Sequence, residues 1–315
     1  MLKQNSSDKP FDSSWLARLK LLFRQSHGET IMADNTHIGP LRVQRTFKAE
    51  DESRHVYILH PPGGYVAGDL IDIHVETQDS SHVVVTSPGA SKFYRCEPDF
   101  RHFPQKPHKP NKSNNQTQTL NLVAKQHSLL EWLPQETIFF KDANAHLETN
   151  IQLDAGSDFI GWEISCLGRT ASGETFGQGR LTQTLNLFQN DVLIHRERLR
   201  LTPEDAIQSQ PWGLDQQPVF GTLLAVLKHR QEEQSSSLRF DRQDQLLAVV
   251  ANLREQISEF PEAQHWSVTT KSGVILVRYL GPHSEPCKNG FSQIRDNLLK
   301  TFKQIEASTP RIWAT

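Results

Sequence analysis

Apolar and polar residues alternate with a period of two along much of the chain, from its start to about Leu201. This spacing places apolar side chains on one face of an extended strand and polar side chains on the other. In Leu70–Thr77, for example, Ile71, Ile73 and Val75 share one face. The pattern predicts a half-buried strand there. Further strands, separated by turns containing Gly and Pro, are predicted at Trp15–Phe23, Leu41–Thr46, His55–Leu59, His82–Thr86, Gln116–Ala124, Asn144–Leu153, Ile160–Cys166 and Arg180–Leu187.

Helical periodicity is confined to the C-terminal third. The segments Phe220–Gln234 and Asp244–Phe260 are long and free of proline, and we predict a helix for each. A third helix is predicted over Phe291–Ser308, because Pro310 cannot continue it. A short pair of strands precedes this helix, at Ser267–Thr270 and Gly273–Leu280.

Two polar tracts, Glu97–Asn115 and Gln231–Ser237, are interpreted as surface loops. Neither tract separates two complete hydrophobic patterns. The sequence therefore predicts one elongated, mainly β domain over residues 1–315, with a strand-rich body at 1–201 and a mixed helical and strand portion at 202–315.

Charge and hydropathy exclude several classes of protein. The chain has 315 residues, 34 of them basic and 36 acidic, so no overall positive field attracts nucleic acid or anionic lipid. Apolar runs such as Leu19–Phe23 and Leu246–Val250 fall short of the ~20 residues of a membrane span. The N-terminus lacks the apolar core of a secretion signal, which predicts a cytoplasmic protein. Cys96, Cys166 and Cys287 are far apart, as expected for free thiols in a reducing compartment.

Four segments occur in a distinctive order: HPPGGYVAGD (His60–Asp69), TSPGASKFYRC (Thr86–Cys96), LEWLPQETIFF (Leu130–Phe140) and GWEISCLGRTASGETFGQG (Gly161–Gly179). The chain ends in PRIWAT (Pro310–Thr315). Together these segments resemble the UreD family of urease accessory proteins, also called UreH. The resemblance runs from about residue 15 to the last residue and is more specific than any one short motif.

The sequence departs from the family pattern in a few places. The tract Glu97–Asn115 is longer and more polar than the usual link, and Tyr65 and Cys96 replace residues that are more common in the family. His102 and His108 lie in this tract and suggest a nickel-binding tail, but its composition is more typical of a solvated spacer. These departures affect surface detail more than family membership.

The resemblance implies a fold and a role. The fold is a coiled, β-helix-like body of many strands with a few helices in the C-terminal third. The role is that of a metallochaperone scaffold, not an enzyme, which is required for nickel insertion into the urease active site. Its implied partners are apo-urease, a helical UreF-type accessory protein and, through that protein, a UreG-type GTPase. Nickel is in transit through an internal water-filled path, and no tightly bound cofactor is expected.

Nickel in transit needs ligands that hold it briefly and release it, and carboxylates along a wet passage meet this need. Within the family segments the acidic candidates for such a path are Asp69, Glu131, Glu136, Glu163 and Glu174. Thr86 and Ser87 are weaker candidates for lining the tunnel, and Cys166 is a weak candidate ligand. Because they lie at the end of the chain, where exposure is expected, Arg311 and Trp313 are also predicted to help bind the accessory protein.

Other interpretations remain open for these residues. The carboxylates have an equally good explanation in structural ion pairs with Lys92, Arg95 or Arg169. Cys166 alternates with apolar residues, which favours a core thiol. Asp72, His74 and Glu76 share a strand face, where a solvated surface is more common than a metal site.

Two other functional classes are weighed against a scaffold. One is a β-rich, metal-dependent or carbohydrate-active hydrolase with Glu163 and Glu174 as paired acids. The other is a generic interaction module. The sequence contains no HExxH motif, and Gly63–Asp69 lacks the Lys-Ser/Thr ending of a phosphate-binding loop, so nucleotide binding is expected of the partner GTPase.

Overall fold

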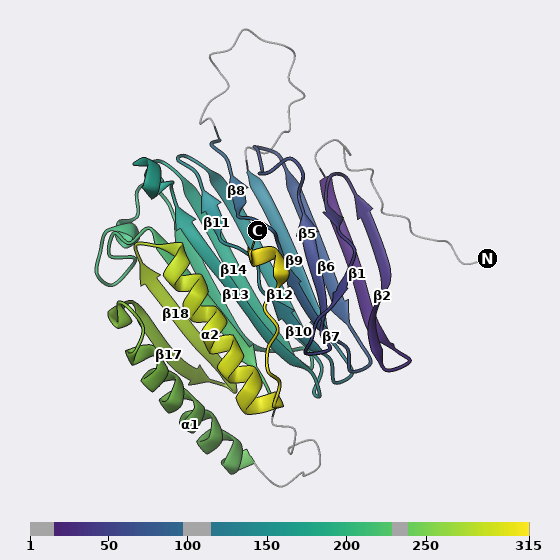
Figure 1. The fold of residues 1–315 in the computed structure, drawn as a ribbon. Coiled ribbons are helices and arrows are strands. Elements are labelled where there is room, and N and C mark those ends of the chain that lie inside the picture. The colour runs from purple at the N-terminus through teal and green to yellow at the C-terminus, as the bar shows by residue number, and fades with distance from the viewer. Residues whose placement is uncertain (1–15, 97–114, 229–238, 315) are drawn as a thin grey trace, which may run out of the picture.

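The computed structural model describes residues 16–96, 115–228 and 239–314, and it contains two large β-sheets with two helices on one side (Figure 1). The first sheet has seven strands in the order β15-β14-β12-β9-β6-β1-β2. Its strands are β1 (Leu16–Ser26), β2 (Glu29–Ile38), β6 (Leu70–Thr77), β9 (Gln116–Ala124), β12 (Asn144–Leu153), β14 (Arg180–Gln189) and β15 (Val192–Leu201).

The second sheet has eleven strands, and its main path runs β17-β18-β16-β13-β10-β7-β5-β3. Its strands are β3 (Arg42–Val43), β4 (Phe47–Lys48), β5 (Arg54–Leu59), β7 (His82–Thr86), β8 (Ser91–Phe93), β10 (Leu129–Trp132), β11 (Thr137–Phe139), β13 (Asp158–Leu167), β16 (Val219–Val226), β17 (Trp266–Lys271) and β18 (Val274–Gly281).

The middle of the chain winds back and forth between the two sheets. After β6 in the first sheet it passes to β7 in the second, then to β9 and β10, and then to β12 and β13. Each turn lies beside the previous one, so β6, β9, β12 and β14 pair in parallel, as do β5, β7, β10 and β13. The predicted coiled, β-helix-like body is therefore confirmed.

The alternation in the sequence fills the space between the sheets. Leu19, Leu21, Ile73 and Val75 point inward from the first sheet, and Val85 is among the residues that meet them from the second. Burial of such side chains stabilises a fold by roughly 25 cal/mol per Å² of apolar surface. In the first sheet, the polar residues that alternate with these apolar residues lie on the outer face.

A second core lies between the outer face of the second sheet and the helices α1 (Arg239–Ser258) and α2 (Ser284–Lys303). Trp162 of β13 packs against Phe291 of α2, with ring centroids 6.0 Å apart. Strands β13, β16 and β18 thus contribute side chains to both cores. No helix among the described residues is long and apolar enough to span a membrane.

The prediction of a helix over Phe220–Gln234 is wrong for its first part, where β16 forms instead. Leu223 and Ala225 face the helices, whereas Leu224 and Val226 face the first sheet. A strand buried on both faces is apolar at every position, and its sequence therefore resembles that of a buried helix. Residues 229–238, which include the polar tract Gln231–Ser237, lie outside the described residues.

Most other predicted elements are confirmed, several with their bounds unchanged. The strand predicted at Leu41–Thr46 is shorter than expected, and β2 and β15 were not predicted. Helix α2 begins at Ser284, earlier than the predicted Phe291, because Pro286 falls in its first turn, where no intrahelical donor is needed. Of the tract Glu97–Asn115, residues 97–114 lie outside the described residues.

A buried ion pair fastens α2 to the second sheet. Glu131 of β10 is fully buried, and Nε of Arg295, which is 1% exposed, lies 2.5 Å from its Oε2 atom. Nη2 of Arg295 donates to the other carboxylate oxygen, and His82 Nε2 lies 2.6 Å from that same oxygen. Burial alone raises the pKa of Glu131, but Arg295 and His82 outweigh burial and lower that pKa to about 2.

Arg295 also holds the segment that follows α2. Its Nη1 atom donates to the carbonyl oxygen of Ser308, 3.2 Å away. The backbone N–H of Ser308 donates to Asp51, and Ser308 Oγ accepts from the backbone N–H of Asp51. At the end of α2, Lys303 forms an ion pair with the buried Asp158 of β13. The C-terminal portion is therefore attached to the strand-rich body by buried charge.

Replacing Glu131 with Gln is expected to lower the free energy of unfolding at pH 7 by about 3–5 kcal/mol, because Arg295 then stays buried without its counter-charge. The native pKa of Glu131 lies below its ordinary value of 4.5, so its contribution is complete above pH 4.5 and is lost as the pH falls toward 2. Urea denaturation at pH 7 and pH 3 measures both effects. The matched control is Glu174→Gln, which breaks a surface pair and is expected to cost about 1 kcal/mol or less. Equal stability of the two variants at pH 7 would contradict the assignment.

Candidate functional site

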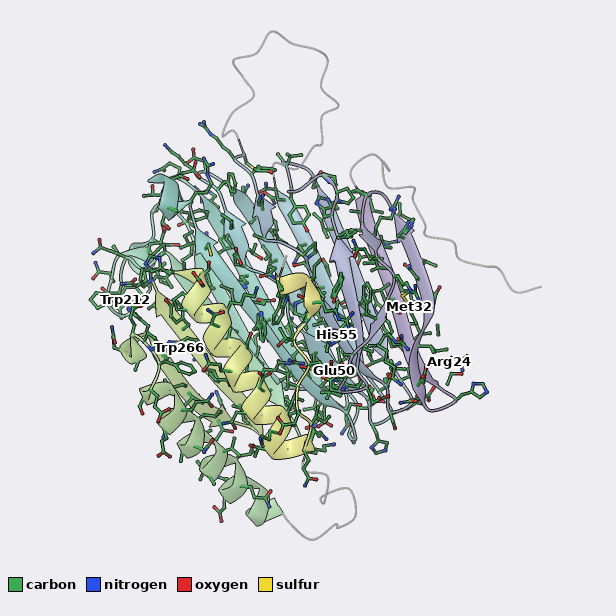
Figure 2. All side chains as sticks on the ribbon, in the orientation of Figure 1. Arg24, Met32, Glu50, His55, Trp212 and Trp266 are labelled. Atoms are coloured by element: carbon green, nitrogen blue, oxygen red, sulfur yellow. The ribbon has the colours of Figure 1, made fainter. Side chains whose placement is uncertain are left out.

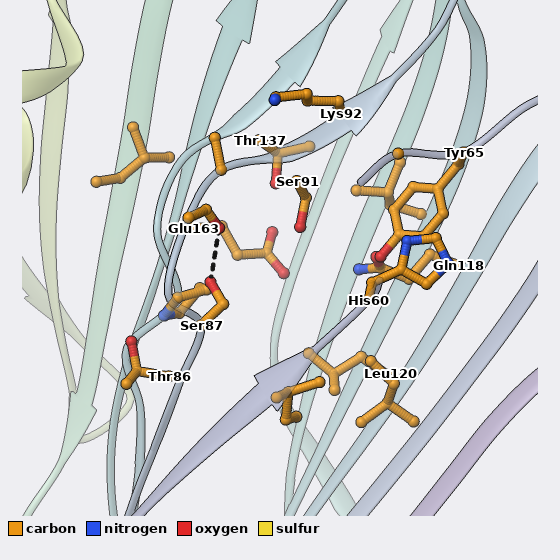
Figure 3. Close-up of a pocket in the computed structure, with 18 of the residues that line it drawn as sticks. His60, Tyr65, Thr86, Ser87, Ser91, Lys92, Gln118, Leu120, Thr137 and Glu163 are labelled. Atoms are coloured by element: carbon orange, nitrogen blue, oxygen red, sulfur yellow. Dashed lines mark hydrogen bonds between the residues drawn. The ribbon is translucent and has the colours of Figure 1, made fainter. Parts of the chain in front are cut away.

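A cavity of about 310 Å³ lies between the two sheets, below the loops that contain His60–Tyr65 and Ser87–Lys92 (Figure 3). These loops belong to two of the sequence segments singled out above. Figure 3 shows Glu163 projecting into this cavity from β13, with Ser91 and Tyr65 nearby. Gln118 of β9 and Thr137 of β11 add polar groups to its wall. The cavity is thus a space with both polar and apolar walls inside an otherwise apolar core.

A second cavity of about 640 Å³ lies between β14 and β15 of the first sheet and β16, β17 and β18 of the second. Glu163 and Gln183 line both cavities, so the two spaces adjoin at this pair of side chains. Together they run along the inside of the body from the His60 loop toward the edge formed by β15 and β17.

Glu163 owes its position to the strand alternation. On β13, Ile160, Trp162 and Ile164 face the helices, which leaves Glu163 and Ser165 on the inner face. Residues of the first sheet meet this inner face across the gap between the sheets.

The carboxylate of Glu163 accepts hydrogen bonds from Thr149 Oγ1 at 2.6 Å and from Gln183 Nε2. Burial raises the pKa of Glu163 and the charge of Glu197 adds to this, while the hydrogen bonds from Thr149 and Gln183 oppose it. Among the described residues this carboxylate has no cationic partner, so no ion pair offsets the cost of burying its charge.

An ion pair crosses from one sheet to the other beside the second cavity. Arg278 of β18 contacts Glu197 of β15, and His195 Nε2 lies 3.0 Å from the same carboxylate oxygen. Glu197 and Arg278 both line the cavity. The positive charge of Arg278 is therefore paired with Glu197 and not with Glu163.

Thr86 and Ser87, which were predicted to line a tunnel, both line the first cavity. Ser87 Oγ donates to the carbonyl oxygen of Gly89, which the dashed line in Figure 3 marks. Thr86 Oγ1 donates to the carbonyl oxygen of Leu133 and accepts from the indole N–H of Trp313 at 3.0 Å. Of the five acidic residues singled out in the sequence, Glu163 is the one that shares this cavity with them.

The other acidic candidates lie elsewhere. Asp69 lines a third cavity and accepts a hydrogen bond from the backbone N–H of Val66. Glu174 pairs with Arg169 at 2.7 Å on the surface, as the alternative of structural ion pairs predicted. Glu136 is half-buried. Glu131 faces the helices and is held by Arg295.

Cys166 also faces the helices, where it belongs to the second core. Burial raises the pKa of Cys166 to about 12, so the thiol keeps its proton. Asp72 forms an ion pair with Arg18 on the outer face of the first sheet, consistent with the solvated face expected there. Within the described ranges, no group of three or more His, Cys, Asp and Glu side chains is arranged to hold a metal ion.

The C-terminal segment packs on the body. Trp313 lies 5.9 Å from Trp162 between ring centroids, and Lys288 Nζ is 4.8 Å from the centre of its ring. Arg311 is exposed. The two residues assigned to partner binding therefore differ: one is largely a packing residue, and the other presents its charge to solvent.

Sequence reasoning missed Gln183, Thr149, Glu197 and Arg278 as residues at or beside the cavities. Arg278 gave a usable signal, because it is the one charged residue in the apolar run GVILVRYL. The proposed acid pair of a hydrolase is not assembled: Glu163 lies between the sheets, and Glu174 is engaged at the surface by Arg169.

The fold and the cavities together define the class of the protein. It is a coiled protein of two β-sheets, with cavities between them and a helical C-terminal portion. Residues 16–314 match the family model described as UreD urease accessory protein. Curated proteins named urease accessory protein UreD are similar over nearly the whole chain. The relative from Saccharophagus degradans is 34% identical over 302 residues, covering 96% of this chain and 93% of its own. The relative from Escherichia coli is 33% identical over 307 residues, covering 96% and 98%. The chain belongs to the UreD family of urease accessory proteins.

Replacing Glu163 with Gln is expected to leave the protein at least as stable as wild type at pH 7. The native pKa of Glu163 is raised, so wild type loses stability as the pH rises above the ordinary carboxyl value, and Gln removes this loss. Thermal unfolding at pH 4 and pH 7 provides the measurement. A variant that is less stable than wild type, by the same amount at both values, would show that the hydrogen bonds of Glu163 outweigh its burial.

Proposed function

We propose that this protein is a non-catalytic scaffold for urease maturation, through which nickel passes on its way to the urease active site. The adjoining cavities around Glu163 are the single observation that carries the proposal. Nickel is cargo in this proposal and not a resident cofactor.

Physical chemistry supports a passage at this place. The wall of the first cavity offers one carboxylate, hydroxyl groups and amide oxygens, which attract a hydrated divalent cation without forming a rigid coordination shell. Lys92 lines the same cavity and is its one lysine or arginine among the described residues. A closed site with several soft or imidazole ligands would hold nickel too tightly for transfer. Glu163 carries a negative charge at the place where the two cavities adjoin.

The proposed partners follow from the family. Apo-urease receives the metal, and a helical UreF-type protein joins the scaffold to a UreG-type GTPase, all in the cytoplasm. We assign the C-terminal segment to the accessory-protein interface, because Arg311 is exposed there while Trp313 anchors the segment on Trp162 and Thr86.

Glu163→Gln is expected to reduce nickel-dependent activation of urease about tenfold or more, because the passage loses its one negative charge between the cavities. The same variant is expected to capture apo-urease and the helical accessory protein normally, since Glu163 is inside the protein. Activation is measured as urease activity against nickel concentration in a host whose own copy of the gene is deleted.

The matched control is Glu148→Gln, on the exposed face of β12 beside Thr149. It changes the same charge by the same chemistry but outside the passage, and activation is expected to stay at the wild-type level. Normal activation with Glu163→Gln at limiting nickel refutes the passage. Normal activation in the host without any copy of the gene refutes the scaffold itself.

Arg311→Glu is expected to weaken capture of the helical accessory protein several-fold, because a charge at the rim of an interface is reversed. Truncation after Ser308 is expected to weaken it further, while the bonds from Asp51 and Arg295 to Ser308 are kept. Quantitative pull-downs with the full chain as reference measure both. If the truncated chain captures the helical accessory protein as well as the full chain does, the C-terminal segment is not part of the interface.

A further inference from the structure

The two sheets do not end together at the edge beyond β15. The second sheet continues through β16, β18 and β17, whereas β15 is the last strand of the first sheet. On β17, Trp266 and Val268 are buried under the helices, but Ser267 and Thr269, which point the other way, are exposed. The inner face of β17 is therefore a ledge that no described strand of the first sheet covers.

The free edge of β15 borders this ledge. Within the part of the chain that the structure describes, β15 pairs with β14 and with no other strand. Its ten residues leave outward N–H and C=O groups without backbone partners among the described residues. Proteins usually protect such an edge, because it is a template for another strand. The second cavity lies between this edge and the ledge.

The edge strand is also strongly basic on one face. Arg196, Arg198 and Arg200 alternate along β15 and are exposed. Arg196 donates to the side-chain oxygen of Asn186, and none of the three forms an ion pair with a described residue. Three uncompensated positive charges in a row stand out in a chain whose net charge is -2.

Exposed apolar side chains flank the same edge. Val192 and Leu193, at the start of β15, are 63% and 40% exposed. Trp212 is 73% exposed and projects from the side of the molecule that carries β17 and β18 (Figure 2). Its neighbours Gly213 and Leu214 line the second cavity. Aromatic and Arg side chains of this kind are enriched in protein interfaces.

We propose that β15 is a docking edge for an extended acidic segment of apo-urease, which adds a strand to the first sheet and covers the ledge of β17. Alternate Asp or Glu side chains on such a strand face the row of Arg196, Arg198 and Arg200. A helical partner does not supply an extended strand, so the choice of apo-urease as the occupant rests on the proposed function. The added strand also closes the second cavity on its open side, next to Glu197 and Arg278.

The test compares two double variants. One reverses the charge, by Arg198→Glu and Arg200→Glu together, and the other is a control that keeps the charge, by Arg198→Lys and Arg200→Lys together. Capture of apo-urease by the reversed variant is expected to fall about tenfold or more and to lose most of its salt dependence. The control is expected to retain most of the capture of apo-urease. Both variants are expected to bind the helical accessory protein as the wild type does. Circular dichroism confirms that both remain folded.

Hydrogen exchange of the complex provides an independent measurement. Amides of β15 are expected to become protected when apo-urease binds, while amides of β2, the opposite edge of the same sheet, are not. Unchanged capture of apo-urease by the reversed variant, equal loss of both partners, or unprotected β15 amides in the complex each overturn the docking edge. A wild-type chain that captures no apo-urease at all refutes the proposed function instead, and with it the choice of occupant.

Discussion

The buried ion pair between Glu131 and Arg295 determines how the rest of the molecule is arranged. Removing two charges from water is expensive, and the cost is offset here by two hydrogen bonds between them and by His82. The geometry has to be exact to within a few tenths of an ångström, which fixes α2 against β10. The outer face of the second sheet is thereby covered by the helices, and its inner face packs against the first sheet around the cavities.

A polar region around the cavities interrupts the apolar core between the two sheets. Gln118, Thr149, Glu163, Ser165 and Gln183 point into it from four strands, where apolar side chains would give more stability. Polar side chains between two sheets do not follow the usual pattern of an apolar core, and such departures are expected where function requires them. The apolar side chains around this polar region hold the two sheets together, so the fold remains stable although the cavities are not filled.

Much of the fold could be predicted because period-two alternation reports half-buried strands directly. It failed at β16, where burial on both faces removes the alternation. The site was harder to predict, since alternation does not tell which face meets a sheet and which meets a helix. Glu131 and Glu163 both stand among apolar neighbours in sequence, yet they face opposite sides of the second sheet. The partner of Glu131 is 164 residues away, beyond the reach of any local pattern.

Glu131 and Glu163 also differ in the property that the proposed nickel passage requires. Both are buried, but the pKa of Glu131 is lowered by Arg295 and that of Glu163 is raised by burial. A carboxylate that is already paired with a buried Arg gains little free energy by exchanging this partner for a metal ion. Beside the second cavity, Arg278 is held by Glu197, and Glu163 keeps only hydrogen bonds from Thr149 and Gln183 among the described residues. A cation that comes near therefore stabilises its negative charge, and the proposed transfer of a divalent ion through the body depends on this property.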